Sequence, residues 1–115
     1  MTKSDQRHFK ADTLLSTLGR DAEGFSGLVN IPVHRASTIL HPNTAALKTA
    51  GLLNDRDVVY GRYGTPTTFA LQDTVAEIEG GYRSFAFGSG KAAILAAFLA
   101  FLKAGDHLLI VDSAY

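Results

Sequence analysis

Gly88, Ser89 and Gly90 are residues that could bind a phosphate group. They stand between two apolar stretches, residues 84–87 and 92–102. If the first stretch is a strand and the second a helix, the turn presents free backbone N–H groups and the positive end of the helix dipole. Ser89 adds a hydroxyl donor. The alternative is a tight turn that needs glycine for its backbone angles, and the motif alone leaves both interpretations open.

Two better-known phosphate motifs do not match this turn. A P-loop would need glycine at Phe85 and serine or threonine at Ala92, so Lys91 is not a Walker lysine. The dinucleotide fingerprint would need glycine at Ala93, a change that is sometimes tolerated. Asp112 is the one acidic residue in a suitable later position, so this motif stays a minor alternative.

A second group that could bind an anion is Tyr60 with Arg62. Arg62 offers a planar fork suited to phosphate or carboxylate, and Tyr60 offers a hydroxyl. In an extended segment, residues two apart point to the same side. The alternative is an exposed turn in which the tyrosine packs on the arginine. Tyr115 follows an apolar stretch and could stack on a ligand ring, although it could also be an ordinary loop tyrosine.

Composition excludes several other functions. The chain has 115 residues, of which 46% are hydrophobic and 19% charged, and its net charge is zero. These values indicate a globular protein with no basic surface for nucleic acid or membrane. The absence of cysteine excludes disulfides and fits a cytoplasmic protein. The histidines lack metal-ligand spacing, so we expect no metal site.

The elements that would position these residues lie mainly in the second half of the chain. Thr65 and Pro66 predict a helix start, and the glycine pair at 80–81 predicts its end. Strands over residues 84–87 and 108–112 would flank a buried helix over 92–102. Strand, helix and strand in this order predict a right-handed βαβ unit in a parallel sheet, and therefore an α/β fold.

The first half predicts an extended arm, residues 1–59, that precedes an α/β domain beginning at residue 60. Asp12 is the expected N-cap of a short helix that ends at Gly19, and residues 45–53 predict a second helix. Such an arm has little core and usually packs on another body, often a partner subunit. Because a parallel strand needs neighbours, the strand over residues 108–112 leads us to expect a piece of a longer protein.

Several motifs together resemble the Cys/Met-metabolism family of pyridoxal phosphate (PLP) enzymes. They are Tyr60-Gly61-Arg62 with Gly64-Thr65, Ile78-Glu79-Gly80-Gly81, Ser89-Gly90, Gly105-Asp106-His107 and Tyr115. The resemblance runs from about Thr13 to the last residue. It implies PLP as cofactor and a fold-type I, aminotransferase-like α/β fold with an extended N-terminal arm and the start of a mainly parallel sheet.

Within that family, Gly61, Thr65 and residues 35–39 resemble the β-lyase branch, whereas many other members have Tyr-Ser-Arg followed by Gly-Asn-Pro-Thr. The resemblance implies a carbon–sulfur lyase that converts L-cystathionine to L-homocysteine, pyruvate and ammonia in methionine biosynthesis. The alternatives are a cystathionine γ-synthase, a cystathionine γ-lyase, a methionine γ-lyase, or a non-catalytic phosphate-binding or interaction module.

The resemblance also assigns roles to individual residues. Tyr60 and Arg62 match the pair that reaches across a dimer interface to the PLP phosphate of the neighbouring subunit. Tyr115 matches the tyrosine that stacks on the PLP ring. The family pattern thus implies a homo-oligomer, a dimer with shared active sites that assembles into a tetramer.

Ser89, Gly90 and the backbone N–H of Lys91 match the phosphate cup of the same family. The family often has methionine or alanine at the position of Lys91, so this side chain is a departure. The Schiff-base lysine lies well downstream in the family. The resemblance therefore places no catalytic residue in this chain, and Lys91 is not that lysine.

Overall fold

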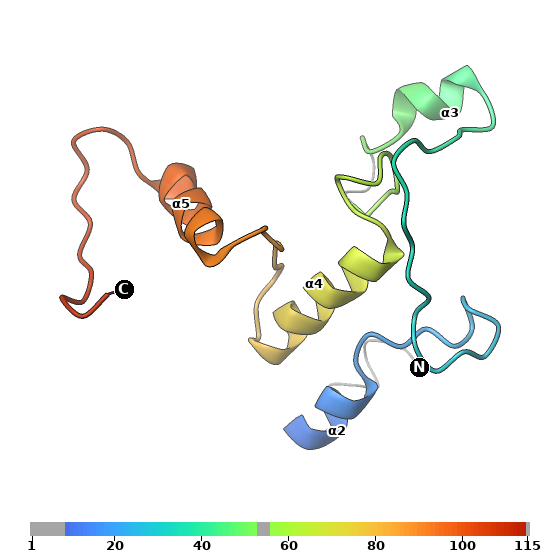
Figure 1. Ribbon diagram of the computed structural model, residues 1–115, viewed down its shortest axis with the longest axis horizontal. Coiled ribbons are helices and arrows are strands. Elements are labelled where there is room, and N and C mark those ends of the chain that lie inside the picture. The colour runs from blue at the N-terminus through green and yellow to red at the C-terminus, as the bar shows by residue number, and fades with distance from the viewer. Residues whose placement is uncertain (1–8, 53–55, 115) are drawn as a thin grey trace. The chain divides into compact units, whose positions relative to one another are not determined.

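The computed structural model describes residues 9–52 and 56–114. Among these residues it has α2 (Ala11–Thr17), α3 (Thr44–Thr49), α4 (Pro66–Ile78) and α5 (Gly90–Phe101) (Figure 1). Contacts divide the chain into two units, Met1–Phe85 and Ala86–Tyr115, which are described separately. The boundary expected between residues 59 and 60 concerns the domains of a larger protein and stays a prediction.

The first unit is built around α4. As expected, Thr65 is the N-cap, with φ −133° and ψ 169°, and Pro66 is the first helical residue. The Thr65 hydroxyl makes no capping bond and lies 3.4 Å from the Thr68 hydroxyl. Among the described residues the buried apolar core is Ala76 alone, joined by the buried polar side chains of Thr65 and Gln72. Polar contacts therefore hold much of this unit together.

The end of α4 confirms the role expected for the glycine pair. Gly80 has φ +63°, a conformation that glycine adopts without strain. The N–H of Gly81 donates to the carbonyl of Ala76 at 2.7 Å, and the N–H of Gly80 donates to the carbonyl of Glu77 at 3.3 Å. This pair of bonds is a Schellman motif, which satisfies two of the last carbonyls of the helix.

The two short helices differ in detail from the expected ones. The prediction of Asp12 as N-cap was wrong: α2 begins earlier, with Lys10 at the cap and Asp12 in the first turn. A carboxylate is also favourable there, because it faces the positive end of the helix dipole. α3 is shorter than expected; Asn43 caps it by accepting from the N–H of Ala46 at 2.8 Å.

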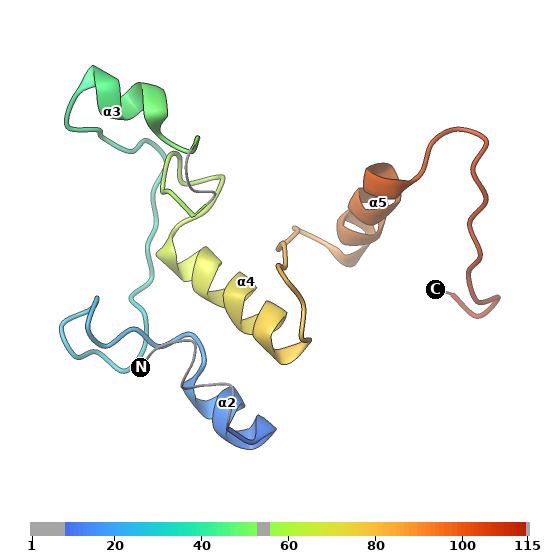
Figure 2. The same ribbon diagram turned by 180° about the vertical axis from the view of Figure 1, so that it is seen from behind.

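The arm docks on α4 of its own chain. The Thr67 hydroxyl donates to the carbonyl of Pro32 at 2.8 Å and accepts from the N–H of His34 at 2.9 Å. In both views the segment that leads to α3 passes the N-terminal end of α4 (Figures 1 and 2). At the other end of α4, α2 packs against the helix. The arm therefore packs on α4 within its own unit.

The second unit contains α5 and differs most from expectation. No α5 residue is buried, whereas the sequence predicted a buried helix. Residues 84–87 and 108–112 do not form strands; the one β-bridge in the described part of the chain joins Thr38 to Tyr60. A strand requires backbone partners, and the described residues supply none at these positions. The βαβ unit and its parallel sheet are thus not confirmed. None of the helices described is long and apolar enough to cross a membrane.

Candidate functional site

Tyr60 and Arg62 lie in a tight turn that is attached to the arm. The N–H of Gly61 donates to the carbonyl of Ser37 at 2.7 Å, and the N–H of Tyr63 donates back to the carbonyl of Tyr60 at 2.9 Å. The bridge between Thr38 and Tyr60 adds an antiparallel contact. The segment is therefore a turn and not the extended strand in which the two side chains would point to the same side.

Gly61 has no room for a side chain. A Cβ atom built at this position would lie 1.8 Å from the carbonyl oxygen of Ala36, which belongs to the backbone and cannot rotate away. The sequence marked Gly61 only as part of a family motif. The structure adds a physical reason, because glycine allows the turn and the arm to come into contact.

The side chain of Arg62 stacks on two tyrosines. Its guanidinium carbon lies 5.7 Å from the ring centre of Tyr60 and 5.8 Å from that of Tyr63, and the two rings meet edge to face at 5.9 Å. Within the described part of the chain Arg62 donates no hydrogen bond. A cation–π contact of this kind uses none of the guanidinium's N–H groups as hydrogen-bond donors to the protein, so they stay available to an anion. Sequence reasoning missed the contribution of Tyr63.

The N-terminus of α5 has the features of a phosphate cradle. Ser89 is the N-cap, and its hydroxyl oxygen accepts from the N–H of Ala92 at 3.2 Å. The N–H groups of Gly90 and Lys91 belong to the first turn, where a helix offers no internal acceptor. The Ser89 O–H can still donate. Two backbone donors and one hydroxyl donor thus occur within three residues.

The glycines of this turn are not explained by backbone strain. Neither Gly88 nor Gly90 has positive φ, and a Cβ atom at either position would meet no described atom within 4 Å. The alternative that the turn needs glycine for its angles is therefore not supported. Open space above the backbone favours close approach of a ligand.

Lys91 shares one face of α5 with apolar residues. It lines an open hollow together with Gly90, Ile94, Leu95 and Phe98. Spacings of three, four and seven residues put Lys91 in line with these three apolar side chains. Its side chain thus lies along the apolar face, while its backbone N–H belongs to the first turn of α5. Tyr115 lies outside the described residues, and the Tyr60–Arg62 turn and the Ser89–Lys91 turn belong to different units.

Arg56 is a residue that the sequence did not single out. Its Nη1 donates to Oε1 of Gln72 at 2.6 Å, and its Nη2 pairs with Oδ1 of Asp73 at 2.5 Å. Its guanidinium also lies over the ring of Phe69, 5.2 Å from the centroid. The partners are more than twelve residues away in sequence, so no local pattern indicates the contact.

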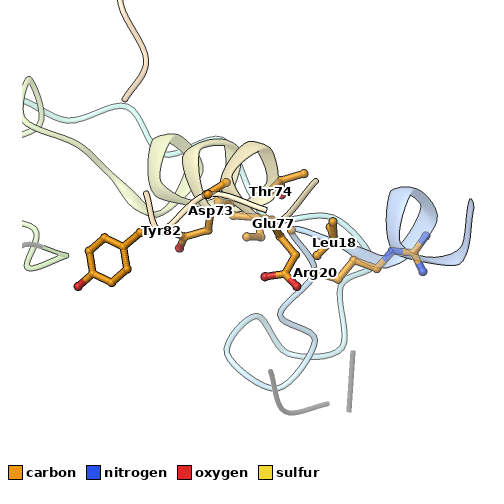
Figure 3. Close-up of a pocket in the computed structure, with 11 residues that line it drawn as sticks. Leu18, Arg20, Asp73, Thr74, Glu77 and Tyr82 are labelled. Carbon is orange, nitrogen blue, oxygen red and sulfur yellow. The ribbon is translucent and has the colours of Figure 1, made fainter. Parts of the chain in front are cut away.

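A polar hollow lies between α4 and the segment that follows α2, and its lining includes no residue of either candidate anion-binding turn. Its lining includes Leu18, Arg20, Asp73, Thr74, Glu77 and Tyr82 (Figure 3). The guanidinium of Arg20 points away from the carboxylate of Glu77. The described residues hold no cluster of histidine and acidic side chains that could bind a metal. We therefore treat the Tyr60–Arg62 turn and the Ser89–Lys91 turn as two separate candidate anion-binding sites, one in each unit.

A family model described as Cys/Met metabolism PLP-dependent enzyme matches residues 12–115. The chain belongs to this family. Its members use PLP and have fold type I, as the resemblance implied. The residues present fit that cofactor: the fork of Arg62 and the free N–H groups at the start of α5 suit a phosphate dianion.

Individual relatives agree with the family. A cystathionine beta-lyase of Bacillus subtilis (strain 168) is 42% identical over 81% of this chain and 22% of its own length. A cystathionine beta-lyase of Escherichia coli (strain K12) is 38% identical over 92% of this chain and 27% of its own length. An L-alanine/L-glutamate racemase of Wolbachia pipientis wMel is 37% identical over 92% of this chain and 29% of its own length. The chain thus spans about a quarter of the length of these relatives.

Proposed function

We propose that the protein to which these residues belong is a cystathionine β-lyase. It would convert L-cystathionine to L-homocysteine, pyruvate and ammonia. Similarity to the two β-lyases named above supports the proposal, as does the Tyr60-Gly61-Arg62 turn. PLP, when bound, supplies the electron sink for such an elimination.

The role of this chain is to bind and orient the cofactor through its phosphate. Ser89, Gly90 and Lys91 would bind the phosphate with the hydroxyl and two backbone N–H groups. Tyr60 and Arg62 would bind the phosphate in a second subunit of the same kind, in a dimer with shared sites and a tetramer of such dimers. Tyr115 would stack on the pyridine ring, which the sheet of the α/β domain would help to position.

The observation that carries this proposal is the state of Arg62. Its guanidinium lies near two tyrosine rings and donates no hydrogen bond to any described residue. A cation whose N–H groups bind no described residue is suited to an anionic ligand. In a PLP enzyme that ligand is the cofactor phosphate.

The racemase relative shows that a similar sequence occurs in an enzyme with a different reaction. We therefore expect Tyr60, Arg62 and the Ser89–Lys91 turn to bind the cofactor but not to determine which reaction the enzyme catalyses. Racemisation of L-alanine is the second candidate, because that relative matches the chain over a similar length. Assays of the complete protein distinguish the two reactions: a β-lyase forms pyruvate from L-cystathionine, and a racemase forms D-alanine from L-alanine.

The phosphate assignment is tested by Arg62→Ala in the complete protein. Dissociation constants are measured for PLP and for pyridoxal, which lacks the phosphate. Loss of a charged hydrogen-bond donor should weaken PLP binding about 10- to 100-fold and leave pyridoxal binding unchanged. Arg83→Ala is the matched control, because Arg83 also stacks on a tyrosine, at 5.5 Å from the Tyr82 ring. Equal loss for both ligands, or no loss, would contradict the proposal.

A further inference from the structure

We propose that Arg56 is a positioning residue for the phosphate-binding turn. It would hold one end of the loop that carries Tyr60 and Arg62 against α4, and so set the direction of the Arg62 guanidinium. This inference rests on the proposed function. Arg56 itself would not touch the cofactor, because both of its Nη atoms bind residues of α4.

The first support is the strength of the attachment to α4. Gln72, which accepts from Arg56, is 7% exposed, and the Arg56 side chain is 19% exposed, whereas the Asp73 side chain is 46% exposed. The charge-assisted hydrogen bond to Gln72 is therefore the shielded and stronger part of the attachment, and the ion pair with Asp73 adds the smaller contribution of a surface pair.

The second support is that both ends of the loop meet the same aromatic ring. Arg56, before the turn, lies over the Phe69 ring. Gly64, after the turn, lies so close to Phe69 that a Cβ atom there would be 2.1 Å from Cε1 of the ring. The loop over residues 56–64 thus closes on Phe69 from its two ends, with the turn between them.

The third support is the contact at the middle of the loop. The N–H of Gly61 donates to the carbonyl of Ser37 in the arm. The arm in turn is held to α4 by the Thr67 hydroxyl. The loop is therefore fixed to α4 at its start, at its end and, through the arm, at its middle. Removing Arg56 releases the start, which is four residues from Tyr60.

The test uses Arg56→Ala and Arg56→Lys in the complete protein, with the ratio of PLP to pyridoxal affinity as the readout. Arg56→Ala should lower this preference for PLP about 3- to 10-fold, while pyridoxal affinity stays within about twofold. Lysine can pair with Asp73 but cannot bind Gln72 through a second nitrogen, so it should give an intermediate value. Arg83→Ala should leave the preference unchanged.

A double variant separates positioning from general stabilisation. If Arg56 acts through Arg62, then Arg56→Ala combined with Arg62→Ala should show the same preference as Arg62→Ala alone. Should Arg56→Ala fail to fold, Asp73→Asn removes the ion pair with little change in size and is expected to lower the preference in the same way.

The outcomes distinguish the two proposals. If Arg62→Ala lowers the preference for PLP and the Arg56 and Asp73 variants do not, the positioning role is overturned and the phosphate site stands. If the Arg56 variants weaken both ligands equally, Arg56 supports only the fold, and the inference is again overturned. If Arg62→Ala has no effect on the preference for PLP, the proposed phosphate site is contradicted, and the positioning role that rests on it is contradicted as well.

Discussion

At the scale of single residues, the turn at Tyr60–Arg62 depends as much on a missing side chain as on those present. The backbone of Gly61 lies against the carbonyl of Ala36 and donates to the carbonyl of Ser37. Only glycine permits this approach. The direction of the Arg62 guanidinium therefore depends on its neighbour in the chain, and this dependence can be tested separately from charge.

We predict that Gly61→Ala destabilises the complete protein and weakens PLP binding. The new Cβ would lie 1.8 Å from a backbone oxygen, so the arm or the turn has to move. The expected loss in the free energy of unfolding is about 1–3 kcal/mol, measured by denaturant unfolding.

Gly81→Ala is the control for this change. Gly81 does not have positive φ, and a Cβ there would meet the carbonyl oxygen of Ala76 at an ordinary 3.7 Å. Its effect should stay within about 0.5 kcal/mol. Equal unfolding midpoints for the two variants would show that the contact between Gly61 and the arm is not tight in solution.

At the scale of elements, helices were predictable where their signals are local. Thr65 and Pro66 begin α4 and the glycine pair ends it, as expected, whereas α5 begins at Gly90, two residues before the expected start, with Ser89 as its N-cap. Each of these signals acts within four residues of the helix end. The contacts of Arg56 with α4 span 16 and 17 residues, so no local sequence pattern indicates them.

The strands expected over residues 84–87 and 108–112 illustrate the opposite case. Their apolar composition was identified correctly, but a strand exists only when another strand pairs with it. In this structure Leu109 is 99% exposed and Val111 is 69% exposed. Sequence pattern can therefore indicate the tendency to form a strand but not the presence of its partner.

We predict that the arm is released locally when the Thr67 hydroxyl is removed. Thr67→Val keeps a β-branched side chain and loses the bonds to His34 and Pro32. Hydrogen exchange measured by mass spectrometry on the complete protein should show faster exchange of the His34 amide, by about tenfold.

Thr68→Val serves as the matched control for the arm. Among the described residues the Thr68 hydroxyl makes only a 3.4 Å contact with the Thr65 hydroxyl. It should leave exchange at His34 unchanged. If the His34 amide exchanges at the same rate in both variants, the arm is held to α4 by other contacts.

At the scale of the whole molecule, the family could be predicted from the sequence and the arrangement of the sheet could not. The motifs from Tyr60 to the end combine into a specific pattern, and the family match confirms the prediction. The apolar side chains of α5, such as Leu99 at 73% and Phe101 at 84% exposed, have no covering layer in the described residues. The chain spans about a quarter of the length of its relatives, and a fold-type I domain of their length could supply that layer.

We propose that Arg62 binds the PLP phosphate of a second subunit. This proposal is tested most directly by unfolding and refolding the Arg62→Ala and Tyr115→Ala variants of the complete protein together in equal amounts. If Arg62 serves the neighbour's site and Tyr115 its own, half of the dimers are mixed and each mixed dimer has one intact site. About a quarter of all sites should then regain normal activity, as two-fold symmetry requires.

Arg62→Ala refolded with Tyr60→Ala is the control, because both residues would serve the neighbour's site and no mixed dimer would contain an intact one. This mixture should show the mean activity of its two parents. The account is supported if only the Arg62→Ala and Tyr115→Ala mixture exceeds the mean of its parents. It is contradicted if that mixture also gives no more than the mean.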